Sequence, residues 1–131
     1  MLLIQHWAIA MTSFSLNFFK EDDGTKPVGV FIKNLKNNEG LQAKLISDLN
    51  RLEILGNKAK EPLSKHVEGD IFECRTIFGN LNVRTLYFFD GERIIVATNS
   101  FFKKQQKTPR DQIELAKRRM KKYFDRKGMG L

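Results

Sequence analysis

Six polar residues stand out because they fall on or beside three consecutive strand-like segments: Glu73, Arg75, Arg84, Lys103, Lys104 and Lys107. Five of the six are basic, and the third segment ends in the run KKQQK. The sequence contains no phosphate-binding glycine loop, zinc-protease helix or nucleophile elbow. Taken singly, each strand residue could be a solvated outward position. Together they indicate a surface that binds an anion.

RNA is an anion that suits this set of residues. A ribonucleotide carries its own nucleophile, the 2′-OH beside the phosphodiester, so a protein can cleave RNA without a metal ion. The protein must remove the 2′ proton, stabilise the extra negative charge on phosphorus and assist the leaving 5′ oxygen. Arginine and lysine stabilise that charge, and arginine can bind phosphate bidentately. Glu73, or a lysine with a lowered pKa, is the candidate proton acceptor.

The positive charge of the chain is concentrated near its C-terminus. Residues 1–102 contain 12 Lys and Arg and 12 Asp and Glu, whereas residues 103–131 contain 11 basic and three acidic residues. The whole formal charge of +8 therefore arises in the last quarter, which begins at Lys103. A segregated excess of this kind favours a polyanionic partner, and a solvated basic helix face is the alternative.

Apolar periodicity predicts the elements that hold these side chains. In chain order they are a strand at 14–20, helices at 28–35 and 40–55, strands at 71–78, 82–89 and 93–102, and a C-terminal helix. Gly56 is placed to end the second helix, and Asp90-Gly91 is typical of a tight hairpin. The order β-α-α-β-β-β-α predicts an α+β fold, a small mainly antiparallel sheet with an N-terminal helical hairpin and a C-terminal helix.

The C-terminal helix has a well-marked predicted start. Thr108 can act as the N-cap, Pro109 suits the first helical position and Asp111 the third. The apolar residues that follow share an arc of about 100° at 3.6 residues per turn. This stripe is predicted to pack on the core through Ile113, Ala116, Met120, Tyr123 and Phe124.

The length and composition of the chain limit the number of domains and the kinds of site that it can contain. A chain of 131 residues suits one domain, and its single cysteine, Cys74, cannot form an internal disulfide. His6 and His66 lie far apart and have no ligand cluster around them, so no metal or other cofactor is expected. Residues 1–10 are interpreted as a vector-derived or upstream-start extension, or as an added strand, which leaves 11–131 as the single domain. Their apolar run is shorter than the ~20 residues that span a bilayer and lacks a secretory pattern, so a cytoplasmic protein without a membrane partner is expected.

Longer stretches of the chain resemble a known family. The segments FSLNFFKEDDGTKPVGVFIKNL and GDIFECRTIFGNLNVRTLYFFDGERIIVATNSFFKKQQKTPRDQIELAKRRMKKY are similar to the phage-derived branch of the RelE/HigB toxin superfamily, over roughly residues 14–124. The most specific parts are the E-x-R of Glu73–Arg75, the R-x-x-Y of Arg84–Tyr87, and FFKKQQKTP leading into IELA.

The resemblance implies a type II toxin–antitoxin toxin with a RelE-like fold. Such a toxin is a ribonuclease that cleaves mRNA, usually on the translating ribosome, and its antitoxin is commonly a helix-turn-helix protein. The family's basic strand residues correspond to Arg75, Arg84 and the Lys103/Lys104 pair. The predicted site uses Arg75, Arg84, Lys104 and Glu73 for catalysis, and Lys103, Lys107 and Arg110 for RNA binding. Some relatives carry a basic group where this chain has Glu73, so the identity of the proton acceptor stays open.

Three functions remain as hypotheses. The leading one is a metal-independent mRNA endoribonuclease that a protein partner neutralises. The second is a non-catalytic module that binds RNA, the ribosome or DNA through the basic tail, with an affinity that falls steeply with salt. The third is a phage or prophage accessory protein that has this fold but has lost nuclease activity.

Overall fold

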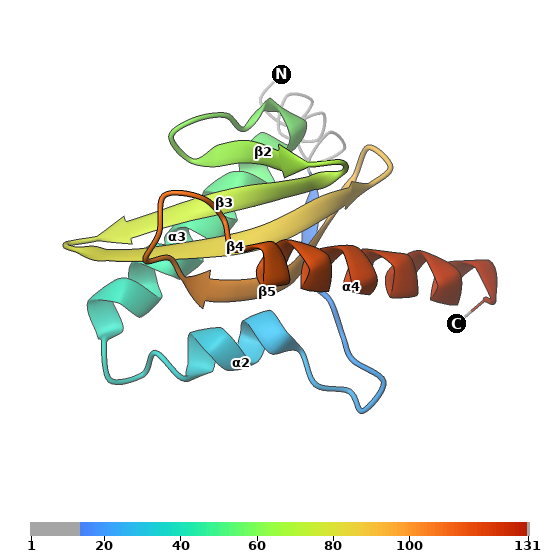
Figure 1. The fold of residues 1–131 in the computed structure, drawn as a ribbon, viewed down its shortest axis with the longest axis horizontal. Coiled ribbons are helices and arrows are strands. Elements are labelled where there is room, and N and C mark those ends of the chain that lie inside the picture. Colours follow the sequence, from blue (N-terminus) through green and yellow to red (C-terminus); the bar gives the residue numbers. More distant parts are fainter. Residues whose placement is uncertain (1–13, 131) are drawn as a thin grey trace, which may run out of the picture.

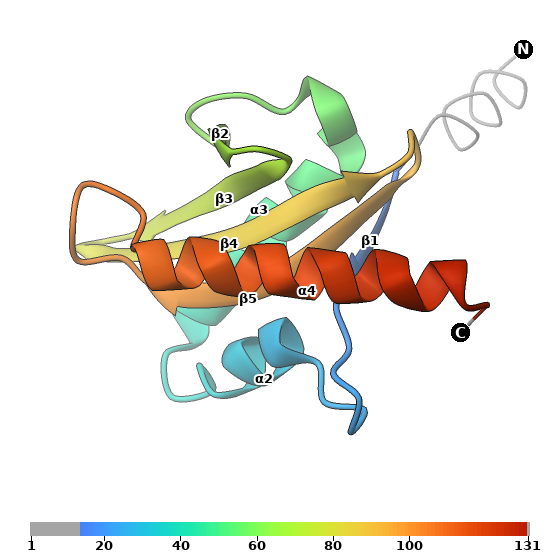
Figure 2. The same cartoon turned by 45° about the vertical axis from the view of Figure 1, so that its right-hand side comes forward.

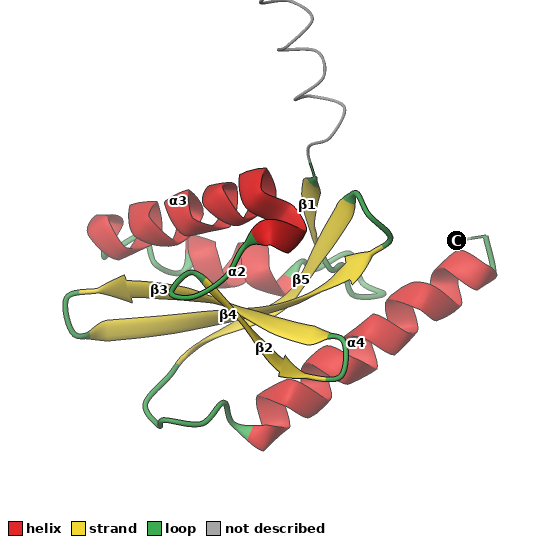
Figure 3. Ribbon diagram, turned by 90° about the horizontal axis from the view of Figure 1, so that it is seen from above, coloured by secondary structure: helices red, strands yellow, loops and turns green. Residues whose placement is uncertain are grey.

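The computed structural model describes residues 14–130, so the predicted extension at residues 1–10 lies outside the described part of the chain (Figure 1). The described residues form an α+β fold with three α-helices, a 3-10 turn and a five-stranded sheet. In chain order the elements are β1 Ser15–Phe18, α2 Pro27–Lys33, α3 Glu39–Leu55, η1 Gly56–Lys58, β2 Ser64–Glu68, β3 Ile71–Phe78, β4 Leu81–Asp90, β5 Ile94–Phe102 and α4 Arg110–Gly128. Helices α2 and α3 cover one face of the sheet and α4 covers the other (Figure 3).

The sheet is mixed, with the strand order β1-β5-β4-β3-β2. β1 pairs with β5 in parallel, and the other three pairs are antiparallel. The predicted order of elements omitted β2 and was wrong at this point. β2 has the sequence SKHVE, in which Lys65 and His66 are exposed, and it is a strand because it pairs with β3 at the sheet edge. Five mostly polar residues carry no periodicity that would reveal such a strand.

The predicted meander of three strands is confirmed as β3, β4 and β5. The hairpin between β4 and β5 forms where Asp90-Gly91 indicated, but its connection comprises residues 91–93. Gly91 adopts φ 66°, and Asp90 remains the last residue of β4. The turn therefore needs the left-handed conformation at the glycine and not at the aspartate.

The first apolar layer lies between the sheet and the predicted helical pair, which is confirmed as α2 and α3. The Asn38 side chain accepts a hydrogen bond from the Leu41 backbone N–H at 3.1 Å and so caps α3. Gly56 ends α3 with φ 58°. The buried leucines of α3 recur at helical spacing and pack against the sheet: Leu41, Leu45, Leu49 and Leu52.

The second apolar layer lies between α4 and the strands β5, β4 and β3 (Figure 2). Ile113 and Ala116 are buried, while Met120 and Tyr123 are partly buried against the core. Phe124 is exposed on one side and meets the Phe88 ring at a centroid distance of 5.5 Å. The predicted apolar stripe is therefore the face by which α4 packs.

The predicted start of α4 was one residue too early, and the prediction that the Thr108 side chain caps the helix was wrong. Pro109 is the N-cap residue, and the helix begins at Arg110 without a side-chain cap. The Thr108 hydroxyl donates to the Glu73 carboxylate on β3 instead. Within residues 14–130, no helix combines the length and the apolar character needed to cross a membrane.

Candidate nucleic-acid interface

A cleft of about 300 Å³ lies between β2, β3, the β5–α4 loop and the first turn of α4. The loop arches out at the end of the sheet where β5 finishes (Figure 2). The cleft lining includes five of the seven residues predicted for the site: Glu73, Arg75, Lys103, Lys107 and Arg110. The other two, Arg84 and Lys104, do not line it. Side chains from distant parts of the chain thus converge on one basic depression.

Glu73 is the buried centre of this group, with only 3% of its side chain exposed. Its Oε1 lies 3.4 Å from Arg75 Nε, and its Oε2 lies 3.5 Å from Arg84 Nε. Thr108 Oγ1 also donates to Oε2, at 3.0 Å. A buried carboxylate needs such compensation, because removing it from water without a partner costs several kcal/mol. Burial excludes the solvated outward position that was the alternative for Glu73 when each strand residue was considered singly.

The two arginines are brought together by the register of the sheet. Arg75 and Arg84 are direct partners across β3 and β4. Like charges placed opposite one another in a sheet repel, and the Glu73 carboxylate between them offsets that repulsion. Arg75 keeps 21% of its side chain exposed, whereas Arg84 keeps 7%. Arg75 can therefore reach a ligand in the cleft, while Arg84 contributes its charge from behind Glu73.

Arg84 is fixed by further contacts on β4. Its Nη1 donates to Asn82 Oδ1 and, at 3.3 Å, to the Val83 carbonyl. Burial lowers the pKa of the Arg84 guanidinium, although the negative charge of Glu73 opposes that shift. An arginine stays charged in spite of such a shift, so the site retains two cations around one anion.

Lys103 and Lys104, adjacent in sequence, occupy different environments. The Lys103 backbone N–H donates to the Asn82 carbonyl at 2.7 Å, and its half-buried side chain lines the cleft. Burial lowers the pKa of the Lys103 ammonium; Glu73 opposes this shift, while Arg84 and Arg75 add to it. Lys104 is exposed. The structure therefore brings Lys103 to the predicted catalytic group and leaves Lys104 outside the cleft.

Arg110 lines the cleft but is engaged by carboxylates. Its guanidinium binds both oxygens of Glu68, at 2.7 and 2.8 Å, and Glu114 at 3.1 Å. These hydrogen bonds, first to Glu68 and then to Glu114, raise the pKa of Arg110. Hydrogen bonds from Arg110 and Lys117 in turn lower the pKa of Glu68 to about 2. An incoming phosphate would have to compete with Glu68 for Arg110.

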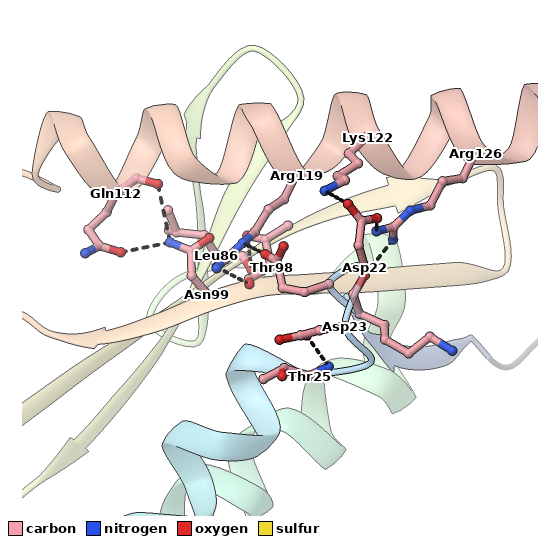
Figure 4. Close-up of polar contacts among 12 residues, drawn as sticks. Asp22, Asp23, Thr25, Leu86, Thr98, Asn99, Gln112, Arg119, Lys122 and Arg126 are labelled. Atoms are coloured by element: carbon pink, nitrogen blue, oxygen red, sulfur yellow. Dashed lines mark hydrogen bonds and ion pairs between the residues drawn. The ribbon is translucent and has the colours of Figure 1, made fainter.

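The basic excess of the C-terminal segment is largely paired within the molecule. Acidic residues from the earlier part of the chain bind α4 through these pairs: Glu68 with Arg110 and Lys117, Glu21 with Arg119, Asp22 with Lys122 and Arg126, and Asp90 with Lys127. Figure 4 shows Lys122 and Arg126 converging on Asp22. Arg118 alone among the described basic residues of α4 makes no ion pair. Among the basic residues at 103–130, those without an ion pair are therefore Arg118 and the three lysines of the β5–α4 loop, Lys103, Lys104 and Lys107.

Sequence reasoning missed Lys65 and assigned Thr108 a different role. Lys65 lines the cleft from β2, a strand that carried no signal. Thr108 was predicted as a helix cap and is instead a partner of Glu73. Tyr87 of the R-x-x-Y segment lies in the core, where burial raises its pKa to about 12 and its hydroxyl hydrogen-bonds Ser64.

Cys74 lies on the opposite face of β3 and packs in the first core layer. Burial raises the pKa of its thiol to about 12, so the reactive thiolate is scarce near neutral pH. Among residues 14–130, no three His, Cys, Asp or Glu side chains gather closely enough to bind a metal ion. The ionisable side chains that line the cleft are its lysines and arginines together with His66, Glu68 and Glu73.

These features define a small α+β protein with a basic cleft beside a buried Arg–Glu–Arg cluster. The chain belongs to the family described as "Phage derived protein Gp49-like (DUF891)", whose family model matches residues 31–121. That range includes the whole of β2, β3, β4 and β5, the β5–α4 loop and the first half of α4.

Two curated relatives from Mycobacterium tuberculosis, strains CDC 1551 / Oshkosh and ATCC 25618 / H37Rv, match part of the chain. Each bears the name "Probable endoribonuclease HigB1" and is 42% identical over 57 residues. The match covers 44% of this chain and 45% of each relative, so it spans less than half the length of either protein. Together with the family match, it confirms the resemblance to the phage-derived branch of the RelE/HigB toxins.

Proposed function

We propose that this protein is the toxin of a type II toxin–antitoxin system, with a RelE-like fold, and that it cleaves mRNA on the translating ribosome without a metal ion. The observation that carries the proposal is the cleft in which Arg75 and Lys103 meet beside the buried Glu73. Family membership and the partial similarity to proteins named as probable endoribonucleases support the coarser part of the proposal, a toxin that cleaves RNA.

The cleft would bind the RNA backbone through its accessible cations. Arg75 would bind the scissile phosphate, because it is the more exposed member of the arginine pair. Lys107, which also lines the cleft, and the exposed Lys104 would bind flanking phosphates. The prediction of Lys104 as a catalytic residue stays a prediction, and the position of Lys103 in the cleft favours Lys103 for that role.

Lys103 is the proton acceptor that the geometry favours. Both Glu73 oxygens already lie near a cation or a hydroxyl donor. Burial, with Arg84 and Arg75 nearby, lowers the pKa of the Lys103 ammonium, which raises the share of neutral amine that can accept a proton. Glu73 would then act as a positioning residue, because it holds Arg75 and Arg84 beside the reacting phosphate.

The reaction would proceed in one displacement at phosphorus. The 2′ oxygen attacks the phosphorus while its proton passes to the Lys103 amine, and the bond to the 5′ oxygen breaks. Arg75, with Arg84 behind Glu73, stabilises the extra negative charge, and a preorganised contact of this kind is typically worth a factor of about 10²–10³ in rate. The departing 5′ oxygen takes a proton from an ammonium group or a water molecule. The products are a 2′,3′-cyclic phosphate and a 5′-hydroxyl.

A cognate antitoxin would neutralise the toxin, and a helix-turn-helix protein is the expected kind. The cytoplasm, which holds mRNA and ribosomes, is the expected site of action. Both points rest on the family and on the resemblance to RelE/HigB toxins.

A non-catalytic module that binds RNA, the ribosome or DNA is the alternative. The observation that favours it is the pairing of Glu73 with two arginines, which leaves no free carboxylate among the lining residues at the centre of the cleft. Such a module would bind RNA with strong salt dependence and would release no cleaved product.

Expression in a bacterial host, with and without the protein encoded beside it, tests the proposal. We expect growth arrest together with new mRNA 5′ ends, both relieved by the antitoxin. Arg75→Ala should lose the arrest, whereas the matched α4 variant Arg118→Ala should retain it. Growth arrest by Arg75→Ala at the wild-type level would contradict the site assignment, and arrest without new mRNA ends would favour the binding module.

A further inference from the structure

Three large apolar side chains at the β3–β4 end of the sheet are exposed: Ile77, Phe78 and Phe102. Two of them are explained by the α2–α3 layer. The Phe102 ring packs on Phe31 at a centroid distance of 5.4 Å, and the Phe78 ring lies so close to Gly40 that a Cβ there would come within 2.3 Å of it. Ile77 lies on the other face of β3 and keeps 55% of its surface exposed.

Ile77 shares a strand face with the residues of the cleft. Side chains alternate along a strand, so Glu73, Arg75 and Ile77 project from the same face of β3. Ile77 lies two residues beyond Arg75, or about 7 Å along the strand. That separation is on the scale of the reach from a backbone phosphate to its own base. A nucleotide whose phosphate binds Arg75 could therefore place its base over Ile77.

Asn82 adds a polar group directly across from this apolar surface. It is the register partner of Ile77 on β4, and its Oδ1 accepts a hydrogen bond from Arg84 Nη1. A guanidinium only donates, so the amide oxygen must face Arg84 and the amide nitrogen remains as a donor. An apolar platform beside one amide donor suits a nucleobase, which has an unsaturated face and acceptor atoms on its edges.

We propose that Ile77 and Asn82 form a subsite for the nucleobase that neighbours the phosphate bound at Arg75. The inference rests on the proposed function, because it requires RNA in the cleft. It extends that function by assigning substrate preference to the end of β3. The ligand class is a base of single-stranded RNA, since a base within a duplex has its faces covered by stacking.

Binding of two uncleavable probes by the full chain tests this subsite. One probe is a fluorescent single-stranded RNA hexamer of mixed sequence with methylated 2′ oxygens, and the other is the same hexamer without bases. Both carry the same phosphates, so the electrostatic part of binding is equal. Fluorescence anisotropy at one salt concentration gives the Kd of each probe for wild type, Ile77→Ser and the control Ile54→Ser. Ile54 is an exposed isoleucine of α3 that does not line the cleft.

We expect wild type and Ile54→Ser to bind the probe with bases roughly three- to tenfold more tightly than the abasic probe. Ile77→Ser should lose most of this difference while its affinity for the abasic probe is unchanged. No preference of wild type for the probe with bases, or a full preference in Ile77→Ser, would overturn the subsite. Neither result would contradict the proposed cleavage of the phosphate bound at Arg75. No binding of either probe by wild type would instead contradict both the subsite and RNA recognition by the free protein. Thermal unfolding of the three proteins checks that the exposed substitutions leave the fold intact.

Discussion

The Thr108 hydroxyl donates a 3.0 Å hydrogen bond to the buried Glu73 carboxylate. This contact joins the residue that precedes the N-cap of α4 to the middle of β3. The β5–α4 loop is thereby held at both ends, since the Lys103 backbone N–H binds the Asn82 carbonyl at its other end. Thr108 thus couples the basic loop to the carboxylate that holds Arg75 and Arg84.

Removing the Thr108 hydroxyl should impair cleavage more than stability. Thr108→Val keeps the shape of the side chain but removes the donor, so Glu73 and Arg75 lose part of their positioning. We expect kcat to fall on the order of tenfold, with a smaller change in KM. Thr108→Ser restores the hydroxyl and should recover most of the rate. Equal activity in Thr108→Val and wild type would show that the contact has no role in the site.

Truncating Glu73 should destabilise the protein. Glu73→Ala leaves Arg84 buried and directly opposite Arg75 without a counter-charge, and we expect a loss of about 3 kcal/mol in the free energy of unfolding. Urea denaturation measures this loss. The double variant Glu73→Leu with Arg84→Met removes both charges and should cost less than the sum of the two single substitutions. Additive losses would mean that the pair is not coupled.

Lys103 and Lys104 form an internal comparison for the proton acceptor. Lys103→Arg keeps the positive charge, but a guanidinium stays protonated and cannot accept the 2′ proton. We therefore expect a rate loss of about 10²–10³. The rise in rate with pH, which reflects the growing share of neutral Lys103 amine in wild type, should also disappear. Lys104→Arg should keep both the rate and the pH profile. The test measures single-turnover cleavage across pH 6 to 9. A greater loss in Lys104→Arg would restore Lys104 as the catalytic lysine.

Glu68 should contribute to stability against acid. Hydrogen bonds from Arg110 and Lys117 lower its pKa from 4.5 to about 2 in the folded protein. A depressed carboxyl pKa stabilises the fold above pH 4.5, and this contribution is lost as the pH falls from 4.5 towards 2. The melting temperature of Glu68→Gln should therefore fall less between pH 6 and pH 3 than that of wild type. Asp70 is an exposed residue of the β2–β3 turn that makes no ion pair with the described residues, so the melting temperature of Asp70→Asn should fall as much as that of wild type.

Much of the fold could be predicted from the sequence because the apolar residues of its helices and strands recur at the spacing of each element. The leucines of α3, the alternation of β3 and the apolar stripe of α4 each reveal a buried face without knowledge of the partner element. β2 could not be found in this way, since SKHVE becomes a strand through its pairing with β3.

The site depends on relationships between distant residues, which local patterns do not contain. Arg75 and Arg84 become neighbours through the β3–β4 register, and only then does Glu73 become a buried counter-charge. The charge count located the basic excess correctly, but pairing of α4 with distant acidic residues such as Glu21 and Glu68 limits what remains for a ligand. Burial of Lys103 beside an exposed Lys104 likewise depends on where the chain leaves β5.

The chemistry of the cut ends is the most direct test of the central proposal. Purified protein is added to an in vitro translation reaction, and the ends of the cleaved mRNA are identified for wild type, Arg75→Ala and Arg118→Ala. Attack by the 2′-OH leaves a 5′-hydroxyl and a 2′,3′-cyclic phosphate, so we expect these ends with wild type and Arg118→Ala, and a loss of at least about 10²-fold with Arg75→Ala. Protein-dependent ends that carry a 5′-phosphate and a 3′-hydroxyl, or no protein-dependent ends at all, would contradict the account.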